Sequence, residues 1–276
     1  MTGRWPALVG SFAVFGYAFL YVPIAILVIY SFNESRLVTV WGGFSTKWYG
    51  ELLANDRILE AAWLSVRIAA ASATGAVLLG TAAAVVLTRF GRFRGRKMFN
   101  GLLLAPLVMP DVIIGLSLLL LFVWLQSQIG WPAGRSGMTI AVAHITVGVA
   151  YTTVIIRARL AQLGRDLDDA AADLGAPPWR GFVEVTLPLL APALASGWLL
   201  AFTLSLDDLV VASFVSGPGS STLPIVIFSS VRLGVSPQIN ALATVMVGVV
   251  ALFVLCAGLM MAWQGRAAAA RRRSHS

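Results

Sequence analysis

Long apolar runs separated by short polar segments dominate the pattern along this chain. About 20 consecutive apolar residues cross the hydrocarbon core of a bilayer. Six runs approach or exceed that length, at residues 7–30, 68–88, 101–125, 137–156, 189–212 and 239–263. We therefore expect an all-α, polytopic membrane protein in which six transmembrane helices form one domain over residues 1–276.

The composition agrees with a membrane protein. Of the 276 residues, 58% are hydrophobic and 12% are charged, whereas soluble domains average about 25% charged residues. The first apolar run is long for the core of a signal peptide, and no small-x-small cleavage site precedes Asn33. We interpret this run as a retained span.

The positive charges predict the orientation of the spans. Fourteen of the 20 lysines and arginines lie near the chain ends or in the segments 89–97 and 157–180, and the loops on the opposite side carry five. Positively charged loops stay in the cytoplasm. We therefore expect both termini to be cytoplasmic in an inner (plasma) membrane. The net charge of +8 then favours the membrane surface over nucleic acid as its partner.

Cysteine and histidine are too scarce to suggest a metal centre. Cys256 is the only cysteine, and the two histidines are His144 and His275. One cysteine excludes a disulfide within the chain, and we expect no metal site. His144 lies in a predicted span, where we interpret it as a residue of helix packing.

Three of the 12 acidic residues fall inside predicted spans: Asp111, Asp207 and Asp208. A carboxylate is costly in hydrocarbon and usually marks a substrate path or a paired charge. No lysine or arginine lies deep in a predicted span to pair with these acids. One interpretation is a hydrogen bond between helices, made by a neutral carboxylic acid. Our hypothesis is the other: the acids line a substrate pathway that attracts a cation.

The positions of these acids refine the hypothesis. Asp111 follows Pro110, and prolines loosen a helix and free backbone carbonyls. Asp111 would lie about halfway through its span. Neighbouring helix positions point about 100° apart, so we expect one of Asp207 and Asp208 to face the path. Trp124 and Tyr151 are candidates for cation–π contacts, although bulk packing also explains both.

Two further segments have recognisable patterns. Ala76, Gly80 and Ala84 repeat at the small-xxx-small spacing that lets helix backbones approach closely. The apolar stretch 223–231 is too short to span the membrane. It fits either a surface helix or a re-entrant segment, and the sequence does not decide between them.

A patterned cytoplasmic segment, DDAAADLGAPPWRGFVEVTLP, covers residues 168–188. Asp166 is a candidate helix cap, and the acids after it favour a helix start. Gly175 suits the end of that helix, and Pro177 and Pro178 prevent its continuation. We expect two short helices, the second running from 178 to about 186, with an apolar face that fits either a protein groove or the membrane surface.

The same segment resembles the EAA loop of ABC importer permeases, EAA-x3-G-x9-I-x-LP. The matching positions, which the resemblance assigns to coupling with an ATPase, are Asp169, Ala170, Ala171, Gly175, Val185, Leu187 and Pro188, with Leu174 beside them. Asp replaces Glu and Val replaces Ile, while the spacing is unbroken. The resemblance implies the MetI-like permease fold. It also implies that loop 157–188 docks, through 166–188, on a separate ATPase subunit.

The stretches APLVMPDVIIGLSLLLLF (105–122) and 201–245 resemble permeases of polyamine importers, above all the second permease of putrescine systems. That resemblance implies a path for putrescine or spermidine and no catalysis by this chain. It also implies a paralogous permease, two ATPase subunits and a periplasmic binding protein as partners. ATP and Mg would be bound by the ATPase, because this chain has no G-x-x-x-x-G-K-[ST] loop.

Other functions stay open from the residues. An importer of Fe(III) or another small solute fits the same loop. A secondary transporter would use Asp111 with Asp207 or Asp208 for proton coupling, and a requirement for ATP would exclude it. An intramembrane enzyme is disfavoured, because the sequence shows no HExxH helix and no Ser/His/Asp set.

Overall fold

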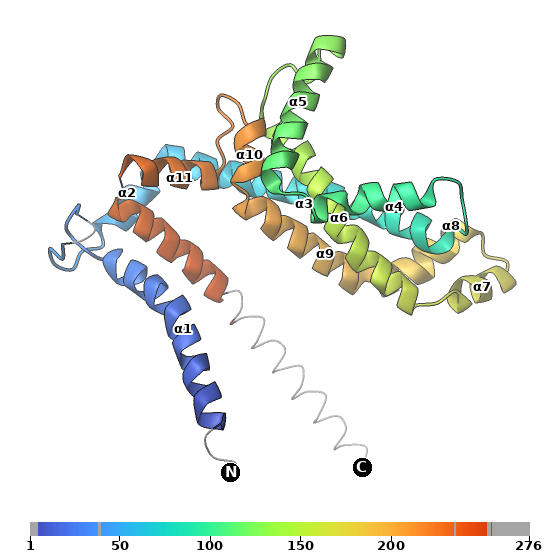
Figure 1. Ribbon diagram of the computed structural model, residues 1–276, viewed down its shortest axis with the longest axis horizontal. Helices are drawn as coiled ribbons and strands as arrows, with labels where there is room; N and C mark the ends of the chain where they lie inside the picture. The colour runs from blue at the N-terminus through green and yellow to red at the C-terminus, as the bar shows by residue number, and fades with distance from the viewer. Residues whose placement is uncertain (1–4, 38–39, 235, 253–254, 256–276) are drawn as a thin grey trace. The chain divides into compact units, whose positions relative to one another are not determined.

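The computed structural model describes residues 5–37, 40–234, 236–252 and 255 (Figure 1). These residues are almost entirely helical; Asn33 and Phe44 form one isolated β-bridge. The helical elements are α1 (Trp5–Tyr30), α2 (Lys47–Leu53), α3 (Asp56–Arg89), α4 (Arg96–Leu104), η1 (Ala105–Leu107), α5 (Asp111–Ile129), α6 (Gly137–Gln162), α7 (Asp166–Asp173), α8 (Pro178–Gly181), η2 (Phe182–Thr186), α9 (Leu187–Asp207), α10 (Val210–Val215) and α11 (Leu223–Leu233).

Among the described residues, five helices are long and apolar enough to cross a membrane: Val9–Tyr30, Asp56–Arg89, Asp111–Ile129, Gly137–Gln162 and Pro178–Asp207. Within the sixth predicted span the structure describes a shorter apolar helix, Pro237–Leu252. Cys256 and His275 lie outside the described residues. The all-α, polytopic class expected from the apolar runs is confirmed.

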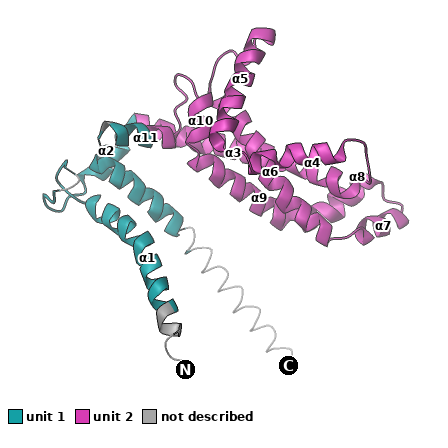
Figure 2. Ribbon diagram, in the orientation of Figure 1, with its two compact units in different colours: residues 1–56, 227–276 teal, residues 57–226 magenta. Residues whose placement is uncertain are grey.

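The chain divides into two compact units, residues 1–56 with 227–276 and residues 57–226 (Figure 2). The expectation of one domain therefore stays a prediction, and each unit is described by itself. The first unit contains the short helix α2. Trp48 of α2 is buried, and its indole N–H donates to the Asn33 carbonyl at 2.6 Å.

The core of the second unit forms where α6 packs against α3 and α9. One cluster joins Ala84 of α3, Ile156 and Leu160 of α6, and Leu190 of α9. The small residues on α3 have the role that their spacing predicts: Ala76 and Ala84 are completely buried. A methyl group added at Gly80 would lie 3.1 Å from the backbone nitrogen of Thr153. The backbones of α3 and α6 are therefore in close contact at Gly80.

The third predicted span, 101–125, is not one helix. It is interrupted between η1 and α5, where Pro110 adopts an extended conformation with ψ 138°. Proline has no backbone N–H to donate and disfavours a helical residue before it, so the helix restarts at Asp111. Asp111 is thus the first residue of α5 and not the midpoint of a continuous helix.

The fifth predicted span, 189–212, differs in the same way. The helix ends at Asp207, Asp208 is extended with ψ 124°, and the short helix α10 follows. At its other end α9 continues from α8 through the π-helical turn η2. The expected break between a second loop helix and the fifth span is therefore absent from this described segment.

Candidate functional site

Both interruptions place their acidic residues at the ends of helices. Asp111 lies in the first turn of α5, Asp207 ends α9, and Asp208 follows it. The last carbonyls of a helix have no partner within the helix, and its carboxyl end carries a partial negative charge. The end of α9 thus adds to the negative charge of its two carboxylates.

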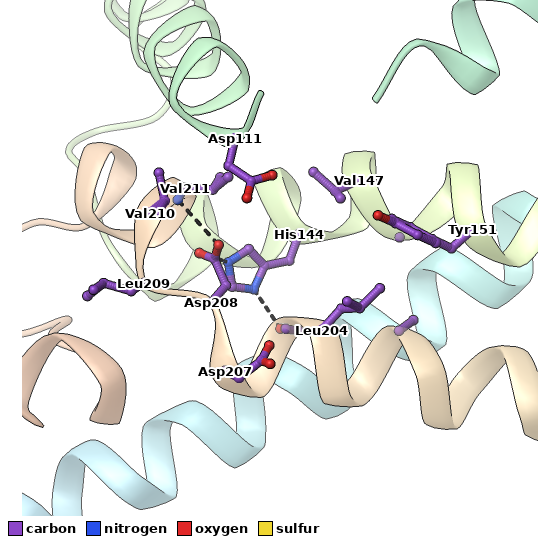
Figure 3. Close-up of a pocket in the computed structure, with 13 residues that line it drawn as sticks. Asp111, His144, Val147, Tyr151, Leu204, Asp207, Asp208, Leu209, Val210 and Val211 are labelled. Atoms are coloured by element: carbon purple, nitrogen blue, oxygen red, sulfur yellow. Dashed lines mark hydrogen bonds and ion pairs between the residues drawn. The ribbon is translucent and has the colours of Figure 1, made fainter. Parts of the chain in front are cut away.

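A cavity of about 360 Å³ brings all three predicted acids together (Figure 3). Residues from α5, α6, α9 and α10 contribute to its wall. They are Asp111, His144, Val147, Gly148, Tyr151, Ala201, Leu204, Ser205, Asp207, Asp208, Leu209, Val210 and Val211. The sequence hypothesis placed these acids along one pathway, and in the structure all three line the same cavity.

One face of each of two helices lines the cavity. On α6 the lining residues are His144, Val147, Gly148 and Tyr151, at the i, i+3, i+4 and i+7 spacing of one helix face. On α9, Ala201, Leu204 and Ser205 follow the first three positions of the same spacing, and Asp207, the last residue of the helix, lines the cavity as well. Tyr151 therefore reaches the cavity, whereas Trp124 is 59% exposed and does not line it.

His144 is buried between α6 and the end of α9, which agrees with the interpretation of a packing residue, and it also lines the cavity. Its Nδ1 lies 2.6 Å from the hydroxyl of Ser205, and its Nε2 lies 3.1 Å from Oδ2 of Asp208. The side chain is only 4% exposed. A signal was present in the sequence, because His144 shares a helix face with Gly148 and Tyr151. The packing of α9 against that face shows that it lines the cavity.

The lining of the cavity favours cations. Three carboxylates contribute, and no lysine or arginine is among the described residues that line it. The side chains of Asp111 and Asp207 are exposed in this chain. The ring of Tyr151 adds a π-face that attracts an ammonium group. His144 adds positive charge only if it is protonated.

The patterned loop forms a second candidate site. Gly175, at φ +78°, follows α7 in the left-handed conformation that glycine favours at a helix end. Arg165 occupies the cap position of α7 without a side-chain cap bond, so the predicted cap, Asp166, is instead the first helical residue. Leu187 and Pro188 begin α9.

The exposed face of this loop is partly apolar. Leu174 is 89% exposed and Trp179 is 68% exposed, and Asp169 and Ala170 are exposed as well. Ala171 and Trp179 also line a groove of about 460 Å³ beside the end of α3. Exposed apolar surface next to a groove is typical of an interaction site.

The chain is similar in sequence to known membrane transport proteins. Residues 76–269 match the family described as "Binding-protein-dependent transport system inner membrane component". The putrescine transport system permease protein PotI of Escherichia coli K12 is 60% identical over 247 residues, which are 90% of this chain and 88% of PotI. The spermidine/putrescine transport system permease protein PotC of the same strain is 43% identical over 260 residues, 94% of this chain and 95% of PotC.

The fold also matches a solved transporter. A chain of a bacterial ABC transporter involved in import of the acidic polysaccharide alginate superposes with a TM-score of 0.68 at 14% identity. The match covers 93% of this chain and 96% of that one. The family match spans most of the chain, and the sequence relatives cover nearly all of it. This multi-pass membrane protein therefore belongs to the family of inner-membrane components of binding-protein-dependent transport systems.

Proposed function

We propose that this chain is a permease subunit of an ATP-driven polyamine importer, with putrescine as its substrate. One observation carries the proposal: relatives named for putrescine and for spermidine/putrescine transport align with nine-tenths of the chain. In this chain three carboxylates line a single cavity. A carboxylate-lined site suits an organic dication.

The chemistry of the cavity is consistent with transient cation binding. Asp111 and Asp207 offer negative charge on a helix start and a helix end, and Tyr151 offers an aromatic face. Interrupted helices at a membrane site supply polar backbone groups without exposing them to lipid. A permease must also release its substrate. Weak contacts spread over several residues therefore suit transport better than a tight site that encloses the substrate.

ATP hydrolysis is assigned to a separate subunit. The chain has no G-x-x-x-x-G-K-[ST] sequence, and the proposal places ATP and Mg on that partner. The loop 166–188 supplies a surface for it, because Leu174 and Trp179 expose apolar area beside charged Asp169. Docked there, the ATPase pair would move the helices as rigid bodies.

The full assembly is this permease, a paralogous permease that forms the other half of the path, two ATPase subunits and a periplasmic binding protein. The excess of positive charge in 89–97 and 157–180 supports a cytoplasmic position for that side of the protein and for both termini. The binding protein would supply most of the selectivity.

Uptake of radiolabelled putrescine by the assembled transporter in proteoliposomes tests the proposal. Binding protein is supplied outside and ATP inside, with spermidine and ferric ion as competitors. ATP-dependent uptake of putrescine is expected. ATP-dependent transport of another solute would keep the importer and exclude the diamine. Uptake that follows a proton gradient without ATP would contradict the proposal.

A further inference from the structure

His144 connects α6 to the interruption that follows α9. The carboxylate of Asp208 accepts a hydrogen bond from Nε2–H of His144, and the Ser205 hydroxyl is hydrogen-bonded to Nδ1 of the same ring. The side chain of Asp208 is 16% exposed and that of His144 is 4% exposed. These three residues thus form a largely buried chain of hydrogen bonds, in which Ser205 lies before the end of α9 and Asp208 directly after it.

Asp208 is also bonded to the start of α10. Its Oδ2 accepts from the backbone N–H of Ala212 at 2.7 Å, and its Oδ1 accepts from Val211 at 3.3 Å. With His144, three donors satisfy the two carboxylate oxygens. These donors offset the negative charge of Asp208, because the first amides of a helix and a histidine N–H both stabilise an anion.

Asp111 and Asp207 differ from Asp208 in their hydrogen bonding. Their side-chain oxygens form no hydrogen bond or ion pair with another residue in the part of the chain that the structure describes. Both line the same cavity, and Figure 3 shows them on opposite sides of the His144–Asp208 pair. An incoming ammonium group would meet these two carboxylates without displacing a donor already in place.

We propose that Asp208 and His144 form a fixed bridge that holds the α9–α10 interruption against α6, and that Asp111 and Asp207 alone bind the ammonium groups of the substrate. The identification of that ligand as a diamine rests on the proposed function. Two free carboxylates on either side of the bridge match the two charged ends of such a molecule. Asp208 and His144 are positioning residues.

Charge and hydrogen bonding can be separated at Asp208. In Asp208→Asn the charge is lost, but the amide oxygen still accepts from the start of α10. In the place of Oδ2, the amide oxygen accepts from both the Ala212 N–H and Nε2–H of His144, so the histidine keeps its tautomer and only the longer bond from Val211 is lost. The bridge therefore survives Asp208→Asn and is lost in Asp208→Leu.

His144 offers a matched pair of variants. Gln at this position keeps a side-chain N–H directed at Asp208, whereas His144→Phe keeps a ring but no donor. We expect His144→Phe to leave the buried carboxylate without one of its donors and to destabilise the transporter. His144→Gln should recover part of the loss.

The test measures two quantities for the assembled transporter: its melting temperature and its ATP-driven putrescine uptake. Asp208→Leu and His144→Phe should lower the melting temperature, whereas Asp111→Asn and Asp207→Asn should not. Uptake should fall at least about tenfold in Asp111→Asn and Asp207→Asn, since removing one member of a charge pair is costly. Asp208→Asn, which keeps the bridge, should lower uptake less than Asp111→Asn or Asp207→Asn does, and Glu51→Gln is the control for an acid outside the cavity.

Two results would overturn the bridge. One is loss of uptake in Asp208→Asn as large as in Asp207→Asn, with an unchanged melting temperature, which would make Asp208 a substrate ligand. The other is a normal melting temperature for Asp208→Leu and His144→Phe. If the wild type takes up no putrescine, the proposed function fails, and the melting temperatures still decide the bridge.

Discussion

The Nε of Arg89 lies 2.9 Å from Oδ2 of Asp168, and this ion pair joins the last turn of α3 to the first turn of α7. Arg89 also donates to the Gly164 carbonyl, and Thr186 donates to Oδ1 of Asp168 at 3.2 Å. Arg89 thus holds the start of the proposed docking loop against the end of α3, and the bond from Thr186 joins the two ends of that loop to each other. A displacement of α7 would be transmitted directly to α3.

Reversing the charge of Arg89 should weaken this connection. Arg89→Glu places like charges together, and loss of the charge-assisted bonds should cost about 2 kcal/mol. We expect a lower melting temperature and weaker stimulation of ATP hydrolysis by the loaded binding protein. The exchange Arg89→Asp with Asp168→Arg should restore part of both. Arg94→Glu, in the neighbouring loop, is the control for charge alone; an equal effect there would exclude a specific pair.

Gly175 tests the shape of the loop. A methyl added at Gly175 would contact nothing within 4 Å, so space is available, but its φ is +78°. A β-branched side chain in this conformation should cost about 1–2 kcal/mol. Gly175→Val should reach the membrane yet transport poorly for each ATP hydrolysed. Gly175→Asn should be milder, because asparagine tolerates the left-handed region; equal, normal uptake by both variants would contradict a coupling role.

The exposed apolar residues of the loop test the docking surface. Trp179→Ala and Leu174→Ser remove side chains that are 68% and 89% exposed in this chain, so neither should destabilise the permease. If an ATPase subunit covers these two side chains, each variant permease should bind that subunit at least about tenfold more weakly, because apolar contacts at the centre of an interface carry much of its affinity. Co-purification of the ATPase subunit with the permease measures this loss. Leu53→Ser, 72% exposed and in the other unit, is the control, and unchanged recovery of the ATPase in both loop variants would place the docking surface elsewhere.

Gly80 tests the close approach of α3 and α6. A methyl group there would lie 3.0 Å from Cβ of Thr152 and 3.1 Å from the Thr153 nitrogen, and the backbone cannot retreat easily. Gly80→Ala should destabilise the protein by about 1–3 kcal/mol, as overpacking does. Gly101→Ala, where nothing lies within 4 Å, should be neutral or slightly stabilising. Thermal denaturation of the purified transporter compares the two, and equal stabilities would contradict the packing.

Local sequence patterns were sufficient for much of this protein. Apolar runs predicted the spans because a helix must satisfy its backbone within the bilayer, whatever its neighbours are. The spacing around Gly175 predicted a helix end because only the local backbone decides it. Pro110 predicted a disturbed helix, although not that Asp111 would begin a new one.

The relationships between distant residues were decided only by tertiary structure. His144 and Asp208 are 64 residues apart, and nothing in the periodicity of either helix indicates that they meet. The sequence predicted that one of Asp207 and Asp208 faces the path, but it could not say which, because both are uncompensated charges in the same apolar run. Packing of α6 against the end of α9 gave Asp208 its histidine donor, and the start of α10 gave the other two, whereas Asp111 and Asp207 have no side-chain partner among the described residues. Such pairing depends on the register between helices, which side-chain packing sets and a single helix does not encode.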